Sequence, residues 1–345
     1  MLKFFMANEF ETLIWAIERG FASLNRGKTA IFGAKFCDAL VNLSEIASEN
    51  LTLFQRDFVK FTELKNNGFN VYNATLEDEF QNIILIAEKY KELNSFHIAK
   101  SFNLLAENGV FLIAAHNAIG AKSVIKNAAQ IFGGGETFNK FHCGIFAARK
   151  NNLPCDQNKL NEFLKFGEIK KFGDYYAKSG VFSADKIDAG SQVLIEAIKS
   201  REIHGIVGDF GAGFGYLSGE LLKTNVKIKE IFLIESDYSA LNLAQMAIIS
   251  NKAKFIWNDA TKIIYKNHFD FIVMNPPFHS ENIKDISLGI SFINSAYNSL
   301  KINAVLYMVA NEKLPYENTL KNIFKNYEII SREKRYKVIV ARRTI

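Results

Sequence analysis

The chain has 345 residues, of which 48% are hydrophobic, and a formal net charge of +6. This length favours two domains, and the composition is typical of globular proteins with sizeable cores. Because the sequence shows neither 18 consecutive apolar residues nor a signal-peptide layout, we expect no membrane span and no export. The cysteines have no metal-ligand spacing, which favours a cytoplasmic, reduced protein without a metal site; they are Cys37, Cys143 and Cys155.

The positive charge is concentrated in the second half of the chain. Residues 1–165 hold 18 Lys and Arg against 17 Asp and Glu, whereas residues 166–345 hold 24 against 19. The last fifteen residues contain Glu333 and six basic residues: Arg332, Lys334, Arg335, Lys337, Arg342 and Arg343. A basic surface suits a polyanion such as RNA because each neutralised phosphate releases counterions. A solvated charged surface with no partner is the alternative.

The first half contains three strand-like segments, at 29–37, 80–89 and 104–117. The three glycines at 133–135 follow a helical pattern, which predicts a loop at a helix end rather than a phosphate-binding loop. Between about 150 and 180 the chain is polar and contains a proline and several glycines. This pattern predicts a connection between two domains, which we place at 1–165 and 166–345.

The second half alternates strand and helix patterns. Strands are predicted at 206–210, 231–237, 253–260, 269–275 and 304–311, and helices at 216–224, 238–252 and 286–301. Alternating units of this length predict an α/β domain in which helices cover both faces of a mostly parallel sheet.

The first half resembles a degenerate copy of the second. The three strand-like segments match 206–215, 269–278 and 299–311 in the same order, with Asn108 aligned to Asn303. A repeat of this kind predicts two tandem Rossmann-like domains, each with a seven-stranded sheet. The first copy lacks the chemical groups of the second. Ile31 stands where the second has Asp209, Lys35 and Cys37 replace two glycines, and residues 86–89 replace residues 275–278.

The first motif runs from the strand at 206–210 into a helix. Its candidate cofactor-binding residues are Asp209, Gly211, Ala212, Gly213 and Gly215. Glycines allow a sharp turn and close approach of a ligand to the backbone. The spacing differs from the dinucleotide fingerprint, and an acid before the turn suits a cationic ligand without phosphate, such as S-adenosylmethionine (SAM). A purely structural tight turn is the alternative.

Polar residues end the next two strands. Glu235 can accept hydrogen bonds from both ribose hydroxyls of a nucleoside, with Ser236 beside it and Asp237 as the alternative acceptor. Asn258 and Asp259 can bind an adenine amino group.

The tetrapeptide Asn275-Pro276-Pro277-Phe278 ends the fourth strand. Two prolines stiffen the turn and cannot continue a strand or helix. The Asn275 amide oxygen and the Pro276 carbonyl can accept the two N–H bonds of an amino group, which would direct the nitrogen lone pair at a methyl donor. Phe278 offers a flat surface on which a base can stack. The motif therefore predicts methylation of an amino nitrogen, and a plain Pro-Pro loop is the alternative.

These residues together resemble the class I SAM-dependent methyltransferases, and more narrowly the bacterial ribosomal RNA guanine-N2 methyltransferases. Three further segments are similar to that family: Gly180–Ser183 with Asp188–Gln192, Asn311–Tyr316, and Tyr336–Val338. The resemblance covers about 165–345 well. The family also has an amino-terminal methyltransferase-like domain without SAM chemistry, as the degenerate first copy suggests.

The resemblance implies methyl transfer from SAM to the exocyclic N2 of a guanine, in 16S rather than 23S rRNA. It further implies that Phe182, Ser183 and Gln192 close over the cofactor or target pocket. His279 is then a residue at the rim of the pocket or a proton acceptor. We expect a monomer that binds ribosomal RNA or a ribosomal subunit, with the first domain recognising RNA or supporting the second. The alternatives are an N-methyltransferase for adenine, cytosine or protein glutamine, a non-catalytic RNA-binding protein, and a nicotinamide oxidoreductase.

Overall fold

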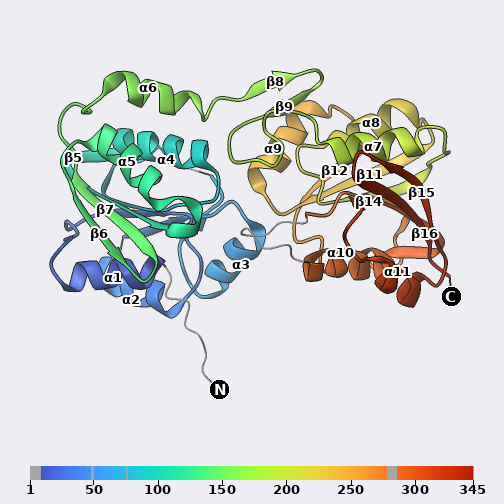
Figure 1. The fold of residues 1–345 in the computed structure, drawn as a ribbon, viewed down its shortest axis with the longest axis horizontal. Helices are drawn as coiled ribbons and strands as arrows, with labels where there is room; N and C mark the ends of the chain where they lie inside the picture. Colours follow the sequence, from blue (N-terminus) through green and yellow to red (C-terminus); the bar gives the residue numbers. More distant parts are fainter. Residues whose placement is uncertain (1–8, 48–49, 75–76, 278–285, 345) are drawn as a thin grey trace. The chain divides into compact units, whose positions relative to one another are not determined.

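A computed structural model of the protein describes residues 9–47, 50–74, 77–277 and 286–344. The chain forms two compact units (Figure 1). Unit 1 extends to Glu168 and also includes Lys178–Gly180, and unit 2 contains Ile169–Ala177 and the chain from Val181 onward. The chain therefore enters unit 2, returns to unit 1 for three residues, and then continues in unit 2.

Unit 1 is a three-layered α/β domain. Its sheet has the order β3-β2-β1-β4-β5-β7-β6, in which β7 is antiparallel to both of its neighbours. Residues of α4, α5 and α6 pack on one face of the sheet, and residues of α1, α2 and α3 pack on the other. The elements of unit 1 are α1 (Glu9–Glu18), β1 (Thr29–Phe32), α2 (Asp38–Ala47), β2 (Leu51–Phe54), α3 (Phe58–Asn66), β3 (Val71–Tyr72), β4 (Phe80–Ile86), α4 (Lys91–Leu104), β5 (Leu105–His116), the 3-10 helix η1 (Asn117–Ile119), α5 (Ala121–Phe132), β6 (Glu136–Lys140), β7 (Cys143–Arg149) and α6 (Gln157–Lys165).

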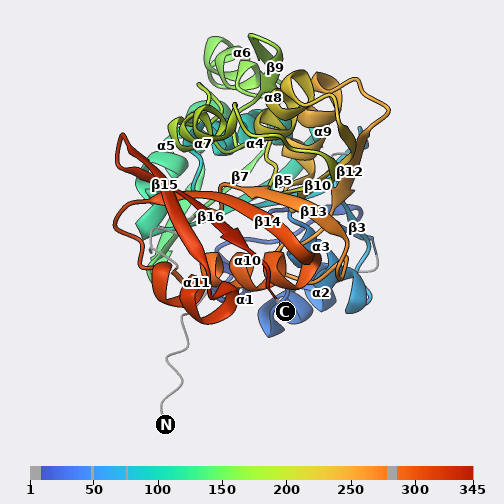
Figure 2. The same cartoon turned by 90° about the vertical axis from the view of Figure 1, so that its right-hand side faces the viewer.

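Unit 2 repeats this architecture. Its main sheet has the order β12-β11-β10-β13-β14-β16-β15, in which β16 is again antiparallel to both of its neighbours. Residues of α7, α8 and α9 pack on one face and residues of α10 and α11 on the other (Figure 2). The elements of unit 2 are β8 (Lys170–Phe172), β9 (Tyr175–Ala177), α7 (Ala189–Ile198), β10 (Gly205–Phe210), α8 (Tyr216–Thr224), β11 (Ile228–Glu235), α9 (Tyr238–Ala247), β12 (Ala253–Trp257), β13 (Phe269–Met274), α10 (Ile286–Ser299), β14 (Leu300–Asn311), α11 (Glu317–Phe324), β15 (Tyr327–Glu333) and β16 (Tyr336–Arg342).

The predicted fold class is confirmed, and the strand register supports the predicted duplication. Ile31 in β1 lies opposite Ile84 in β4, while Asp209 in β10 lies opposite Val273 in β13. Both pairs hold the same place in their sheets, so Ile31 and Asp209 are equivalent positions. Asn108 and Asn303 are also equivalent, and both have a left-handed backbone, with φ of 57° and 66°.

The segment at 150–180 contains more structure than its polarity predicts. Residues 157–165 form α6, whose first turn is capped by the Asp156 carboxylate. Leu160 and Phe163 of this helix are buried in the core of unit 1. Two apolar residues one turn apart are enough to dock a short helix, but they are too few to distinguish it from a loop by periodicity. The glycine-rich part that follows forms the hairpin of β8 and β9.

Candidate active site

The candidate residues of unit 2 lie where β10, β11, β12 and β13 end. All four strands are parallel, so their carboxyl ends share one edge of the sheet. The order of the strands reverses between β10 and β13, and open α/β sheets bind their ligands at such a switch point. The two motifs of the sequence follow β10 and β13, one on each side of this point.

The glycines after β10 form a turn that only glycine adopts without strain. Gly211, Gly213 and Gly215 have φ of 74°, 56° and 87°. A Cβ on Gly215 would lie 2.8 Å from Ile248, so this glycine allows α8 to pack closely on its neighbours. A Cβ on Gly213 would meet nothing within 4 Å. Gly213 therefore leaves open space beside the backbone, which a ligand can approach. Ala212 is buried between these glycines.

Asp209 is a fully buried carboxylate at this edge. Its Oδ2 accepts hydrogen bonds from the Ser218 amide, at 3.1 Å, and from the Ser218 hydroxyl, at 2.6 Å. Its Oδ1 has no hydrogen-bond partner among the described residues. Burial raises the pKa of Asp209 to about 7, although the bonds from Ser218 favour the charged form. A buried acceptor without a donor fits a site whose ligand brings a cationic or N–H donor group.

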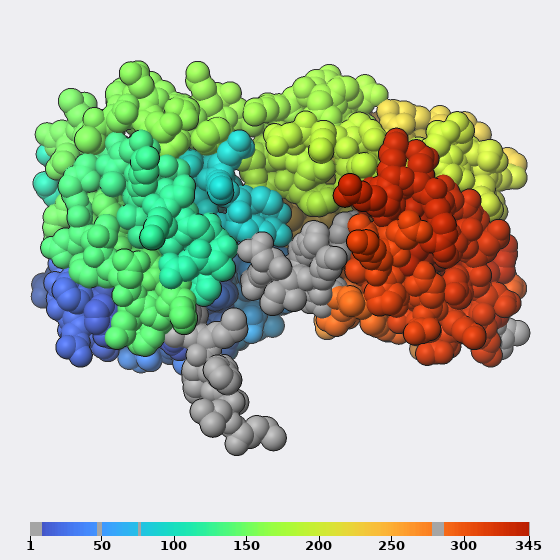
Figure 3. All heavy atoms as spheres, viewed as in Figure 1, coloured from blue at the N-terminus to red at the C-terminus, as the bar shows by residue number. Residues whose placement is uncertain are grey.

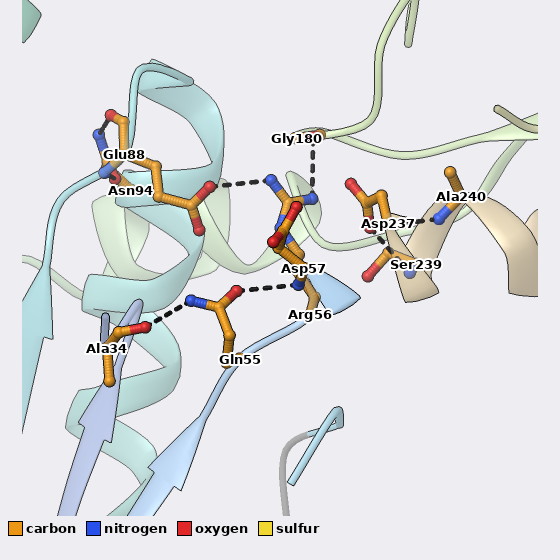
Figure 4. A network of polar contacts seen from close by, with 10 residues as sticks. All are labelled: Ala34, Gln55, Arg56, Asp57, Glu88, Asn94, Gly180, Asp237, Ser239 and Ala240. Carbon is orange, nitrogen blue, oxygen red and sulfur yellow. Dashed lines mark hydrogen bonds and ion pairs between the residues drawn. The ribbon is translucent and has the colours of Figure 1, made fainter. Parts of the chain in front are cut away.

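Glu235 links the ends of two motifs. Its carboxylate accepts hydrogen bonds from the Gly213 and Asp237 amides, both at 2.8 Å. Burial raises the pKa of Glu235, and these amides act against that rise. Asp237 is the N-cap of α9, where its Oδ1 accepts from the Ser239 amide (Figure 4). The Ser236 carbonyl accepts a hydrogen bond from the Trp257 indole at 2.8 Å. Glu235 thus holds the glycine turn against β11, beside the space that Gly213 leaves open.

Asn258 and Asp259 follow β12 and shape a turn. The Asn258 side-chain oxygen accepts from the Asp259 amide at 2.8 Å, and Asp259 accepts from the backbone and hydroxyl of Thr261. Both residues are half-buried. Trp257 and Tyr238 form an edge-to-face pair nearby, with ring centroids 5.1 Å apart. The sequence analysis did not select these two rings, because one aromatic residue at each of two strand ends carries no motif.

Asn275 is held in one orientation by the N-cap residue and the first turn of α7. Its Nδ2 donates to Asp188 Oδ2 at 2.7 Å and to Ser191 Oγ at 2.9 Å. Since a carboxylate only accepts, this contact fixes which end of the amide faces Asp188. The buried Asn275 Oδ1 has no hydrogen-bond partner within the described ranges. The amide oxygen is therefore available as an acceptor in a fixed position. Sequence reasoning missed this role of Asp188 and Ser191, although both lie in a family-like segment.

The remaining predicted site residues differ in their exposure, and two of them lie outside the described ranges. Pro276 is buried and Pro277 is exposed, and both follow Asn275 directly. Phe182 is 55% exposed, Gln192 is exposed on α7, and Ser183 is half-buried with a left-handed φ of 60°. Phe278 and His279 lie outside the described residues.

Several basic residues near the carboxyl terminus make contacts within unit 2. This part of the chain is red in Figure 3 and forms part of the visible surface of unit 2. Lys337 is 1% exposed, and its ammonium group donates to the carbonyls of Glu312 and Leu314 and to Glu317. Arg342 and Arg343 each donate to backbone carbonyls of the chain at the start of β14. Of the six basic residues, four remain exposed: Arg332, Lys334, Arg335 and Arg342. The basic surface is thus narrower than the sequence suggests.

A cavity of about 490 Å³ lies at the opposite, amino end of β10, β13 and β14. Its walls include Arg201, His204, Asp270 and Lys301, and none of the motif residues. Within the described ranges, no group of His, Cys, Asp and Glu side chains is arranged to hold a metal ion, and no helix has the length and apolar character to cross a bilayer.

The methyltransferase small domain family matches residues 174–340. The ribosomal RNA small subunit methyltransferase C of Photorhabdus laumondii is 30% identical over 264 residues, which are 73% of this chain and 74% of that protein. The chain belongs to this methyltransferase family. The relative of the same name from Shewanella loihica is 25% identical over 331 residues, covering 89% of this chain and 92% of the relative.

The same two-unit fold occurs in a solved structure. The 16S rRNA N2 G1207 methyltransferase of T. thermophilus, in complex with AdoMet and guanosine, superimposes with a TM-score of 0.78. It is 21% identical, and the match covers 93% of this chain and 90% of that one. The likeness extends over both units, which confirms the expected fold of two tandem methyltransferase-like domains.

Proposed function

We propose that the protein transfers a methyl group from SAM to the exocyclic N2 of a guanine in 16S ribosomal RNA. The observation that carries this proposal is the Asn275 amide, whose nitrogen is occupied by Asp188 and Ser191 while its oxygen is left as a buried acceptor. An amino group conjugated to a base is a weak nucleophile, because its lone pair is delocalised. An acceptor that holds its N–H bonds directs the lone pair and stabilises the developing positive charge.

The cofactor fits the groups around the glycine turn. Asp209 Oδ1 is a buried acceptor, and Gly213 leaves space beside the backbone. Glu235, which holds the Gly213 amide, is our acceptor for the ribose hydroxyls. When bound, SAM supplies an electrophilic methyl group. Ser236, Asn258 and Asp259 are the further residues that we assign to the cofactor. Pro276 and Pro277 fix the turn after β13, and the Pro276 carbonyl is our second acceptor for the amino group.

The family points to ribosomal RNA as the polymer, since the curated relatives are named small subunit rRNA methyltransferases. We assign Phe182, Ser183, Gln192, Phe278 and His279 to the target pocket. Unit 1, which has lost the polar groups of the second copy, is assigned to RNA recognition or to support of unit 2. We propose a cytoplasmic monomer that acts on rRNA or the small ribosomal subunit.

Nucleoside mass spectrometry of 16S rRNA from cells with and without the gene tests the reaction. We expect one N2-methylguanosine to disappear in its absence and to return when purified protein and SAM are added. An unchanged amount of N2-methylguanosine, with loss of a methylated adenine or cytosine instead, would assign the same chemistry to another base.

A further inference from the structure

The carboxyl edge of unit 1 keeps the framework of a cofactor site. Gln55 holds the position of Glu235: its Oε1 accepts from the Asp57 amide at 2.9 Å, just as Glu235 accepts from the Asp237 amide. Asp57 then caps α3 as Asp237 caps α9. By this correspondence Arg56 stands where unit 2 has Ser236, next to the predicted ribose-binding acid.

Arg56 fills this edge with its own contacts (Figure 4). One end of the guanidinium donates to Glu88 Oε2 at 2.9 Å, and the other donates to the Gly180 carbonyl at 2.8 Å. Glu88 occupies the position of Pro277. The Arg56 side chain is only 16% exposed, so its contacts are weakly screened by solvent. Burial raises the pKa of Glu88, but Arg56 and other neighbouring cations outweigh it and hold this pKa below its ordinary value.

The second target of Arg56, residues 178–180, is the short part of the connection that belongs to unit 1. The Ser179 hydroxyl donates to Glu92 at 2.5 Å, and Ser179 is 9% exposed. Gly180 has φ of 91°, and a Cβ there would lie 2.7 Å from the Leu93 side chain. Three separate contacts, from Arg56, Glu92 and Leu93, thus fix two consecutive residues, Ser179 and Gly180.

The chain continues from Gly180 directly into the candidate target pocket. Val181 is buried in a cluster of unit 2 that also contains Tyr175 and Phe214. Phe182 and Ser183 come next, and Ser183 has a left-handed backbone. Phe182 and Ser183 therefore lie between two fixed points of the chain, which are the buried Val181 before them and the start of α7 after them. Gly180 determines the direction from which the chain arrives at Val181.

We propose that Arg56 is a positioning residue for methyl transfer: it holds residues 178–180 on the former cofactor edge of unit 1 and thereby fixes Phe182 and Ser183. The degenerate edge has exchanged ligand binding for the binding of a segment of its own chain. The kinetic part of this inference rests on the proposed function, whereas the structural part does not. The proposal is therefore tested by two measurements: amide hydrogen exchange, which needs no catalysis, and the kinetics of methyl transfer.

Amide hydrogen exchange on the full-length protein tests the structural part, because exchange reports local opening without any substrate. We expect Arg56→Ala to accelerate exchange at residues 179–183 at least about tenfold, and Arg56→Lys, which keeps one of the two contacts, to have a smaller effect. Arg149→Ala is the matched control. Arg149 also bridges two segments of unit 1, through Asn25 and the Asn108 carbonyl, but at the other end of the sheet. Exchange at 179–183 that is unchanged in Arg56→Ala would overturn the proposal.

Kinetics on deproteinised 16S rRNA and on small ribosomal subunits tests the link to catalysis. We expect Arg56→Ala to lower kcat about tenfold with the KM for RNA within about twofold, and Arg149→Ala to leave kcat unchanged. If Arg56 acts through the segment, its effect is lost in a Phe182→Ala background, since the two changes then disturb one element. Additive effects, or a salt-dependent rise in KM alone, would instead make Arg56 an RNA contact and refute the positioning role. A wild-type protein that methylates no guanine refutes the proposed function but leaves the exchange result standing.

Discussion

In unit 2 the carboxylate Glu235 accepts hydrogen bonds from the Gly213 and Asp237 amides. In unit 1 the side chain at the same place is an amide, and Gln55 accepts from the Asp57 amide while donating to the Ala34 carbonyl at 2.6 Å. Both arrangements tie the first turn to the second strand. The difference is one of charge, which means that a carboxylate can be replaced by an amide while the turn that it supports is kept.

The rest of the carboxyl edge shows the same pattern: the backbone turn is kept in both units while the side chains differ. Gly33 and Gly211 share a positive φ, 75° and 74°, and donate to equivalent carbonyls of Phe54 and Ile234. In contrast, Asp209 is replaced by the apolar Ile31. A buried carboxylate costs stability unless it is fully hydrogen-bonded, so its loss is favoured once no ligand is bound. Backbone requirements persist in both copies because the fold depends on them.

The largest expected effect concerns Asn275, whose position in unit 1 is Ile86. Asn275→Ala removes the oriented acceptor, and we expect kcat to fall about 10³-fold while SAM affinity stays within about threefold. Steady-state kinetics and calorimetry measure the two quantities, with Ile86→Val as the conservative control in unit 1. An equal loss of SAM binding would show that Asn275 belongs to the cofactor site.

The second prediction concerns Glu235→Gln, which gives unit 2 the side chain that unit 1 has at the equivalent position, Gln55. In Glu235→Gln the side chain keeps its bond to the Asp237 amide but loses the charge and the bond to Gly213. We expect the Kd for SAM to rise about tenfold, or about 1.4 kcal/mol, with a small fall in Tm. The reciprocal Gln55→Glu is the control, and it should leave the SAM stoichiometry unchanged because Arg56 and Ile31 remain. Unchanged affinity of Glu235→Gln for SAM would remove Glu235 from the binding site.

The two units should respond to pH in opposite directions. Burial, with the cations of Arg56 and Lys178, lowers the pKa of His97 in unit 1 to about 4, against the attraction of Glu88. Between pH 6.5 and 4 the unfolded chain therefore binds more protons at this histidine, so unit 1 loses stability as pH falls. The pKa of Asp209 is raised to about 7, so the folded state binds more protons, and unit 2 loses stability as pH rises toward 7.

The shifts correspond to about 3 kcal/mol for His97 and about 4 kcal/mol for Asp209. Hydrogen exchange at pH 5 and pH 8 measures both units in one experiment. Relative to the intrinsic exchange rate at each pH, we expect acid to lower the protection of unit 1 more than that of unit 2, and His97→Asn to reduce that sensitivity. Earlier opening of unit 2 at pH 5 would contradict the assignment. In unit 2, Asp209→Asn should remove the decline above pH 5 but weaken SAM binding.

The smallest expected effect is one that the two units share. Asn108 and Asn303 both have a left-handed backbone, and their carbonyls accept hydrogen bonds from Arg149 and Arg342. Ala is strained at such a φ, so we expect Asn108→Ala and Asn303→Ala each to cost about 1 kcal/mol, whereas Gly should be nearly neutral. Urea unfolding measures both. Unequal costs would show that the two turns are no longer equivalent.

The sequence was sufficient to predict the fold and the backbone turns at the carboxyl edge of the sheet of unit 2. Glycine turns and proline pairs have local causes, so their residues identify them, and the duplicated strands could be aligned through buried patterns such as 80–86 and 269–274. The orientation of Asn275 by Asp188 could not be predicted, because it joins residues 87 positions apart. The role of Arg56 was equally hidden, since its partners Glu88 and Gly180 have no fixed spacing from it. The burial of Lys337 shows that counting charges does not locate a charged surface.

The brief return of the chain to unit 1 determines how the protein can be divided. A fragment that begins at Ile169 keeps Ser179 and Gly180 but lacks Glu92, Leu93 and Arg56, which hold them. A fragment that begins at Val181 lacks Tyr175, which packs in the same hydrophobic cluster as Val181. Since neither cut leaves both sets of contacts intact, no single peptide bond separates the two domains cleanly. Deletion of the first copy would therefore also remove contacts that hold the chain where the second begins.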